Sequence, residues 1–175
     1  MPAPDGTQIQ LEVLAELASV FASLKIGFGF GLRSGWALDF LLGRITRVHS
    51  DIDLVSWARE RTRIQRGLLA HEFVHVNDFP AQSNFRKRGA AISVVFITRS
   101  SRASLRQQFP SGALMRRRLT LEGLSMRALA PIQLLDEKLT YGQGNGRPPW
   151  RAKDQVSVQI LQELLRQPRA PGSTA

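Results

Sequence analysis

The chain has 175 residues, of which 43% are hydrophobic, so it is long enough and apolar enough for one domain with its own core. It contains no cysteine, which excludes disulfides, thiolate metal sites and cysteine nucleophiles. Its 24 lysines and arginines against 14 aspartates and glutamates give a net charge of +10, which favours partners that carry phosphate groups.

The first third of the chain predicts a helix, a strand and a second helix. Apolar residues recur at helical spacing over residues 8–24, which is typical of an amphipathic helix. The following KIGFGFGLRS, residues 25–34, predicts a strand, and its glycines lack the spacing of a dinucleotide-binding loop. Residues 34–43, SGWALDFLLG, predict a short helix with Ser34 as its N-cap and Gly43 as its stop.

The rest of the chain predicts strands followed by helices. A strand is expected in RVHSDIDLVSW, residues 47–57. Patterning and turn residues predict a helix over residues 60–72, strands over 73–79 and 90–98, and helices over 131–141 and 152–166. We expect three regions: a core over residues 1–125, a C-terminal helical segment over 126–166 and a disordered tail over 167–175.

The basic residues are concentrated between Arg59 and Arg118, in the runs RERTRIQR, FRKRG, RSSRASLR and MRRRL. A solvated basic face explains any single run, but their accumulation favours a nucleotide or a nucleic acid as partner. Aromatic residues that could stack on bases are sparse in these runs, which weakens the case for nucleic acid.

The N-terminus and the apolar runs bear on localisation. The first residues, MPAPDGTQ, lack the basic and apolar stretches of a secretion signal. No apolar run approaches the roughly 18 residues that a membrane span requires. We therefore expect a cytoplasmic protein without a membrane partner.

Asp51 and Asp53 are two acids one residue apart in an otherwise apolar stretch. In a strand they lie on one face, while Ile52 and Leu54 lie on the other. Adjacent carboxylates repel each other unless a cation lies between them, and Mg²⁺ and Mn²⁺ prefer oxygen ligands of this kind. The pair therefore predicts a site for one of these divalent metals.

A second metal motif is the H-E-x-x-H spacing of His71, Glu72 and His75, which would place two zinc ligands on one face of a helix. The residues after Glu72 are β-branched and aromatic and lead to a turn at Pro80. We therefore expect the helix to end near Glu72 and His75 to lie on a strand. A third zinc ligand is also hard to find, so we rank a zinc hydrolase far behind the other interpretations.

The stretch GLRSGWALDFLLGRITRVHSDIDLV, residues 31–55, resembles the nucleotidyltransferase superfamily, and most closely its aminoglycoside and lincosamide nucleotidyltransferase branch. That branch reads Gly-Gly-Trp-Ala-x-Asp, then Gly-Arg-x-Thr-Arg-x-His-x-Asp-Ile-Asp-Leu. The matching residues are Gly35, Trp36, Ala37, Asp39, Gly43, Arg44, Thr46, Arg47, His49, Asp51, Ile52, Asp53 and Leu54. The resemblance implies an α/β (α+β) fold like that of DNA polymerase beta, with a mixed sheet flanked by helices and a small C-terminal helical segment.

The resemblance also implies a metal-dependent transfer of a nucleoside monophosphate from an NTP to a hydroxyl group. The expected nucleotide is AMP, with ATP as its donor. Asp51 and Asp53 would be the catalytic residues and the ligands of Mg²⁺ or Mn²⁺. A small residue where a helix begins lets phosphates approach its backbone N–H groups. The residues expected to contact the nucleotide are Ser34, Gly35, Arg44 and Lys138.

Other motif residues have a simpler interpretation. Asp39 and His49 are expected to fix a neighbouring loop by hydrogen bonds. Solvated positions explain Arg44 and Arg47 about as well as phosphate contact does, and they explain Lys138 nearly as well. Trp36 is expected to pack against the sheet.

Two residues depart from the branch. Ser34 stands where the branch has glycine, which gives the phosphates a bulkier approach. The branch carries a third carboxylate on a later strand, where GAAISVVFI has Ser93, and a hydroxyl group is neither a strong base nor a charged metal ligand. Either an acid such as Asp78 or Glu72 substitutes, or activity is weak, or the chain is a degenerate member that binds nucleotide or nucleic acid without turnover.

The net charge bears on the acceptor. Aminoglycosides are polycations, and enzymes that bind them profit from acidic pockets, whereas this chain has few acids outside the motif. We therefore expect a neutral or anionic acceptor, such as a small hydroxylated compound, RNA or another protein.

Overall fold

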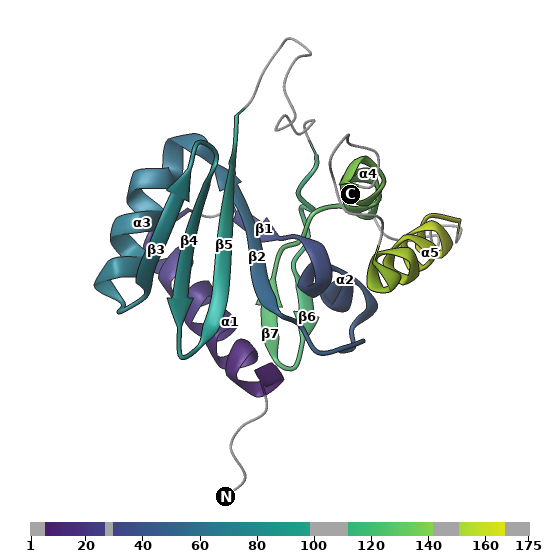
Figure 1. The fold of residues 1–175 in the computed structure, drawn as a ribbon, viewed down its shortest axis with the longest axis horizontal. Coiled ribbons are helices and arrows are strands. Elements are labelled where there is room, and N and C mark those ends of the chain that lie inside the picture. Colours follow the sequence, from purple (N-terminus) through teal and green to yellow (C-terminus); the bar gives the residue numbers. More distant parts are fainter. Residues whose placement is uncertain (1–5, 27–29, 99–111, 142–150, 167–175) are drawn as a thin grey trace, which may run out of the picture.

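The computed structural model describes residues 6–26, 30–98, 112–141 and 151–166. Part of the strand predicted over residues 25–34, the loop over 142–150 and the predicted tail over 167–175 lie outside these ranges. The described chain forms a five-stranded sheet and a separate two-stranded hairpin, with helices packed around them (Figure 1). In this part of the chain no helix is long and apolar enough to cross a membrane.

The helices and strands agree with the predicted α/β class. In chain order they are α1 (Gly6–Ser23), β1 (Phe30–Leu32), α2 (Ser34–Leu42), β2 (Asp51–Trp57), the 3₁₀ turn η2 (Ala58–Glu60), α3 (Arg61–Ala70), β3 (Val74–Phe79), β4 (Gln82–Lys87), β5 (Ala90–Ile97), β6 (Leu119–Leu121), β7 (Leu124–Met126), α4 (Pro131–Tyr141) and α5 (Ala152–Arg166). The two C-terminal helices have the bounds that the sequence predicts.

The sheet is mixed, as predicted, with the strand order β1-β2-β5-β4-β3. Strands β2 and β5 are parallel, and the other neighbours are antiparallel. Parallel pairing places the starts of β2 and β5 side by side, with Asp53 beside Ser93 and Asp51 beside Ala91. Asp53 and Ser93 are thus adjacent across the sheet.

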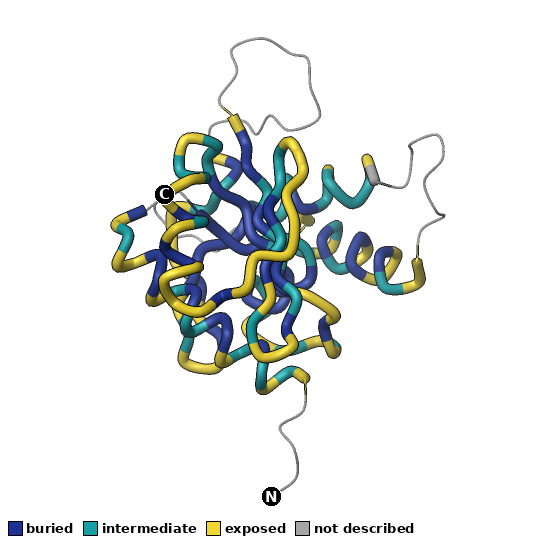
Figure 2. Tube along the Cα trace, turned by 60° about the vertical axis from the view of Figure 1, so that its left-hand side comes forward, coloured by how far each residue is buried: buried dark blue, intermediate teal, exposed yellow. Residues whose placement is uncertain are grey.

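One face of the sheet is covered by helices, and the opposite face is more open. Helix α1 buries Val13, Leu14, Leu17, Val20 and Phe21, which recur at helical spacing, and it contacts β2, β5 and α3. The buried segments of the chain gather in the middle of the molecule (Figure 2). Alternate apolar residues of the strands are buried in this core, among them Ile52, Leu54, Phe85, Ile92 and Val94. Their neighbours along each strand therefore lie on the other face.

Helix α2 and the loop that follows it are held by a buried polar network. The Trp36 indole donates to Gln10 Oε1 over 2.7 Å, and Gln10 Nε2 donates to the carbonyl of His49 over 2.9 Å. The buried Asp39 carboxylate accepts from Thr46 Oγ1 and lies 2.6 Å from His49 Nε2. The prediction that Asp39 and His49 fix this loop is confirmed.

The chain returns to the end of β1 before its last two helices. Leu32 N donates to the carbonyl of Arg127 over 2.8 Å, and Leu129 N donates to the carbonyl of Leu32 over 2.9 Å. Helix α4 begins directly afterwards and contacts α2 and α5. The hydrogen bonds to Leu32 therefore place α4 next to α2, the helix in which the family motif begins.

Candidate active site

A pocket of about 540 Å³ opens on the less covered face of the sheet. Its described lining combines Ser34 at the start of α2, Asp51 and Asp53 on β2, Ser93 on β5 and Glu137 on α4. Residues far apart in the sequence therefore meet in one cavity.

The two aspartates lie on one face of β2, as the sequence predicts. Asp51 is exposed and Asp53 is half-buried, whereas Ile52 and Leu54 between and after them are fully buried on the opposite side. Both carboxylates line the same pocket. Two negative groups are thus available to a ligand from one direction.

A row of polar side chains crosses the pocket floor from β2 to β3. Ser93 Oγ donates to Asp53 Oδ1 over 2.7 Å, so the serine orients this carboxylate but adds no charge. Asn84 lies opposite Ser93 in the register, and its Nδ2 donates to Asn77 Oδ1 over 2.7 Å. Beyond Asp53 the row is therefore uncharged.

The start of α2 forms one wall of the pocket. The predicted N-cap at Ser34 is wrong, because Arg33 precedes the helix and its side chain makes no capping hydrogen bond. Ser34 instead has a φ of 55°, in the left-handed region that favours glycine. The backbone N–H of Arg33 donates to the Asp53 carbonyl over 3.0 Å, which joins this wall to β2.

Helix α4 contributes an acid, Glu137, that the sequence motifs do not predict. Arg33 Nη2 lies 3.0 Å from Glu137 Oε1, and the Glu137 side chain is only 18% exposed. Burial raises the pKa of the Glu137 carboxyl above its ordinary value; the positive Arg33 opposes this rise and the negative Asp53 adds to it. A charged residue three positions after the buried Leu134, on the same face of the helix, is the signal that could have identified it.

Lys138 lines the pocket next to Glu137 and is tied to α5. Its Nζ lies 2.6 Å from Asp154 Oδ1, and Arg151 Nε lies 2.7 Å from Asp154 Oδ2. Burial raises the pKa of Asp154, but hydrogen bonds from Arg151 and Lys138 outweigh it and lower the pKa to about 2. The buried carboxylate thus holds two cations, both of which line the pocket.

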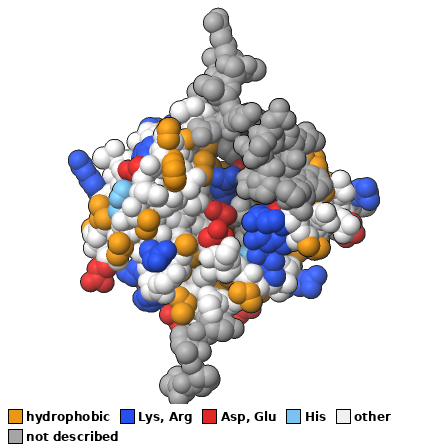
Figure 3. Space-filling model, in the orientation of Figure 1, with side chains coloured by type: hydrophobic (Ala, Val, Ile, Leu, Met, Phe, Trp, Pro, Cys, Tyr) orange, Lys and Arg blue, Asp and Glu red, His pale blue; other side chains and the backbone are white. Residues whose placement is uncertain are grey.

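Acidic and basic side chains lie next to each other in the middle of this face of the molecule (Figure 3). Among the described lining residues the acids are Asp51, Asp53 and Glu137, and the cations are Arg33, Arg86, Lys138 and Arg151. Such a site suits a ligand that brings both a cation and an anion, as a metal-bound phosphate does.

The sequence model of the aminoglycoside-2''-adenylyltransferase family matches residues 14–121, which is more than half of the chain. This range contains both aspartates and Ser93. The chain belongs to the aminoglycoside-2''-adenylyltransferase family. Among curated proteins, none matches the chain.

Solved structures of nucleotidyltransferases share the fold of this family member. ANT(2'')-Ia in complex with adenylyl-2''-tobramycin superposes with a TM-score of 0.75 at 16% identity, over 90% of this chain and 90% of that chain. Lincomycin-bound LnuA, a lincosamide antibiotic adenylyltransferase, gives 0.65 at 16% identity, over 86% and 95%. An antigenic nucleotidyltransferase-like protein from Paracoccidioides brasiliensis gives 0.59 at 23% identity, over 87% and 75%. The predicted nucleotidyltransferase fold is confirmed.

Two residues of the family motif, Gly35 and Arg44, are not among the described residues that line the pocket. Gly35 is buried against the loop after α2, where a Cβ atom would lie 2.5 Å from His49 Nδ1. Arg44 is exposed beyond the end of α2. The close packing of the loop explains the glycine, and contact of either residue with a nucleotide stays a prediction.

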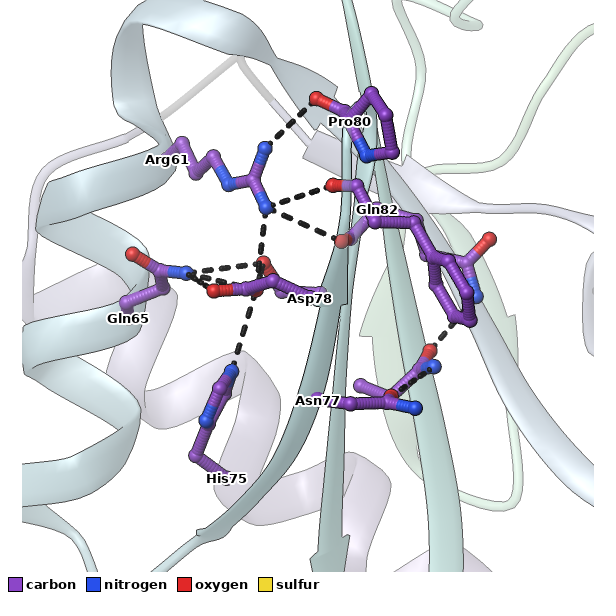
Figure 4. A network of polar contacts seen from close by, with 10 residues as sticks. Arg61, Gln65, His75, Asn77, Asp78, Pro80 and Gln82 are labelled. Atoms are coloured by element: carbon purple, nitrogen blue, oxygen red, sulfur yellow. Dashed lines mark hydrogen bonds and ion pairs between the residues drawn. The ribbon is translucent and has the colours of Figure 1, made fainter.

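The acids considered as substitutes for a third carboxylate, Asp78 and Glu72, are not among the described lining residues either. The Asp78 carboxylate accepts from Ser83 Oγ over 2.6 Å and from Gln65 Nε2, and it pairs with Arg61 and His75 (Figure 4). The Ser83 hydrogen bond, followed by that of His75, lowers the pKa of Asp78 to about 2. This carboxylate joins β3 and β4 to α3, so it is already fully engaged.

The H-E-x-x-H motif is divided between a helix end and a strand, as predicted. Helix α3 ends at Ala70, and Glu72 has a φ of 61° in the turn that follows. His71 Nδ1 lies 2.8 Å from the carbonyl of Gly67, while His75 lies on β3. The helical geometry that would bring both histidines to one zinc ion is absent from this described segment.

Proposed function

We propose that this member of the family transfers AMP from ATP to a hydroxyl group of a small acceptor, with Asp51 and Asp53 as ligands of Mg²⁺. One observation carries the proposal: two carboxylates on the same face of β2 line a pocket that also contains the start of α2 and several cations. Family membership supports the same reaction class.

The donor chemistry of the pocket fits Mg²⁺ or Mn²⁺. In phosphoryl-transfer sites Mg²⁺ is held by one or two carboxylates together with phosphate oxygens and water, so Asp51 and Asp53 suffice on the protein side. In the described part of the chain no group of three or more His, Asp or Glu side chains forms a complete metal cage. The bound ion would neutralise charge that develops on the phosphates.

The triphosphate would lie between the start of α2 and α4. The backbone N–H groups of the first turn of α2 would donate to phosphate oxygens, beginning near Ser34. Arg33 also lines the pocket, so its guanidinium group would add a positive charge near the phosphates. Lys138 would add a positive charge from the opposite wall.

The acceptor is proposed to be a small hydroxylated molecule with little positive charge. Asp51 and Asp53 would be occupied by the metal, and Arg86 and Arg151 are among the remaining lining residues. Asn77 and Asn84 offer uncharged hydrogen-bonding groups on the floor of the same pocket. Such a surface favours hydroxyl groups over a set of ammonium groups.

Loss of either aspartate provides the direct test. In Asp51→Asn and Asp53→Asn variants, pyrophosphate release from ATP with Mg²⁺ and an acceptor should fall by at least about 100-fold, because charge stabilisation at the phosphates is lost. Mn²⁺ binding, measured by electron paramagnetic resonance, should weaken in the same variants. Asp136→Asn is the matched control, since Asp136 is exposed on α4 and outside the described pocket lining.

A specific residue favours a second candidate function. Ser93 occupies the strand position at which a third carboxylate is expected, so the chain would bind ATP without turnover if nothing replaces that acid. Under this alternative a non-hydrolysable ATP analogue binds with Mn²⁺, while pyrophosphate release stays at background for every acceptor. Pyrophosphate release that survives unchanged in both aspartate variants would contradict the primary proposal.

A further inference from the structure

The third carboxylate of the pocket belongs to a helix rather than to the sheet. Among the described lining residues the acids are Asp51, Asp53 and Glu137, and the strand position beside Asp53 is occupied by Ser93. Glu137 enters from α4, on the wall that faces the open side of the sheet. The pocket thus holds one acid beyond the two that the proposed metal site requires.

We propose that Glu137 is the general base of the transfer reaction, which accepts the proton of the acceptor hydroxyl group. This inference rests on the proposed function, because it requires that AMP transfer takes place. It assigns to α4 the task that a carboxylate on β5 would otherwise perform.

The other acids of the region are not available for this task. Asp51 and Asp53 would be committed to the metal, and a carboxylate bound to a metal is a weak base. Asp78 is held by Ser83, Gln65, Arg61 and His75 on the side of β3 and β4 that faces α3.

Glu137 is held in place by its neighbours. Its ion pair with Arg33, at 3.0 Å, connects α4 to the residue whose backbone N–H binds the Asp53 carbonyl. The buried Leu134 and the ion pair of Lys138 with Asp154 anchor the same helix one turn before Glu137 and beside it. The carboxylate is therefore held in the same pocket as Asp51 and Asp53 but on a different wall, where a base could reach an acceptor.

The step balances as a direct displacement. An electron pair of the acceptor oxygen forms the bond to the α-phosphorus of ATP, and the bond from that phosphorus to the bridging oxygen breaks. Pyrophosphate leaves with the electron pair of the broken bond. The acceptor proton passes to Glu137, which later releases it to water.

The test compares Glu137→Gln with the unaltered chain, using ATP, Mg²⁺ and lincomycin or tobramycin as acceptor. We expect kcat to fall at least about 100-fold, the usual contribution of a general base. The Kd of a non-hydrolysable ATP analogue with Mn²⁺ should not change, because the metal ligands remain. Asp136→Asn, an exposed acid on the same helix, should keep full activity.

A second variant separates a base from a purely structural ion pair. In Ser93→Asp/Glu137→Gln a carboxylate returns beside Asp53, and we expect kcat to recover at least about tenfold relative to Glu137→Gln alone. An aspartate on β5 cannot restore a tie between Arg33 and α4, so a structural role predicts no recovery. Glu137→Asp keeps the carboxyl group and should retain part of the activity.

The outcomes separate a failure of the role proposed for Glu137 from a failure of the proposed transfer function. Unchanged kcat in Glu137→Gln, a parallel loss of ATP-analogue binding, or no recovery in the double variant would overturn the role of Glu137 and leave the transfer function intact. If pyrophosphate release by the unaltered chain stays at background for every small hydroxylated acceptor, these two antibiotics included, the proposed function fails and this inference fails with it.

Discussion

Ser34 has a backbone conformation that is unusual for a residue with a side chain. Its φ of 55° lies in the left-handed region, where the Cβ atom crowds the backbone at a cost of roughly 1–2 kcal/mol. The related motif has glycine here, which adopts this conformation without that cost. The chain therefore carries local strain at the wall of its pocket.

Replacing Ser34 by glycine should relieve this strain. We expect Ser34→Gly to stabilise the protein by roughly 0.5–1 kcal/mol, because the relief exceeds the extra entropy of glycine in the unfolded chain. Urea denaturation measures the change. Ser34→Ala removes the hydroxyl group but keeps the strain, so it should show no gain, and equal stability of Ser34→Gly and Ser34→Ala would contradict the strain argument.

The motif contains residues of two different kinds. Asp51 and Asp53 line the pocket, whereas Trp36, Asp39 and His49 are buried. Trp36 donates a hydrogen bond to Gln10, and Asp39 is hydrogen-bonded to His49. A buried polar group requires a hydrogen-bond partner, so each of these side chains depends on its partner, and together they fix the loop before β2. The resemblance of this motif to the family therefore reflects residues that hold the fold together as much as residues that line the pocket.

One buried carboxylate, that of Asp154, links helices α4 and α5. Asp154 is 3% exposed and accepts from both Lys138 and Arg151, which lowers its pKa to about 2. In the unfolded chain an aspartate has a pKa near its usual value of about 3.9. Because the folded pKa is the lower one, the stabilisation is present above about pH 4 and is lost as the pH falls towards 2.

The Asp154→Asn variant should reveal this contribution. At pH 7 we expect it to be less stable by roughly 2.5 kcal/mol, the value that corresponds to the lowered pKa. The difference from the unaltered chain should shrink between about pH 4 and pH 2, because over this range the carboxylate binds a proton in the unfolded chain but not yet in the folded one. Urea denaturation at several pH values measures it, with Glu163→Gln, an exposed acid on α5, as the matched control.

A difference between Asp154→Asn and the unaltered chain that stays constant down to pH 2 would contradict the ion-pair interpretation. In that case the loss would reflect packing, which does not titrate.

Strand β4 and the hairpin strands β6 and β7 are the elements that the sequence does not predict. The segment QSNFRK buries only Ser83 and Phe85, so its apolar alternation is too weak to detect. Strands β6 and β7 have three residues each, which is shorter than any reliable pattern. All three are determined by pairing with other strands, which local sequence does not encode.

At the scale of the whole molecule, the charge of +10 bears on the proposed acceptor. Net positive charge repels a polycation over long range and attracts nucleotides. The described lining of the pocket has the same tendency, because Arg33, Arg86, Lys138 and Arg151 accompany three acids there. Surface and pocket thus favour the same class of acceptor.

We therefore expect a higher kcat/KM for lincomycin than for tobramycin, since tobramycin carries many more amines. The measurement is pyrophosphate release with ATP and Mg²⁺ at low ionic strength, where charge effects are strongest. Added salt should narrow the difference because it screens the repulsion. A preference for tobramycin that persists at all salt concentrations would contradict this assignment.

The sequence alone determined the fold class and the placement of Asp51 and Asp53 on one face of a strand. Helical spacing, strand alternation and the motif around Asp51 and Asp53 are local patterns, and such patterns state which residues share a face. The tertiary structure decided which walls complete the pocket. Glu137 lies 84 residues after Asp53, and only the return of the chain past β1 brings α4, with Glu137, to the aspartates. Contacts of that kind depend on packing between distant elements, so no local pattern contains them.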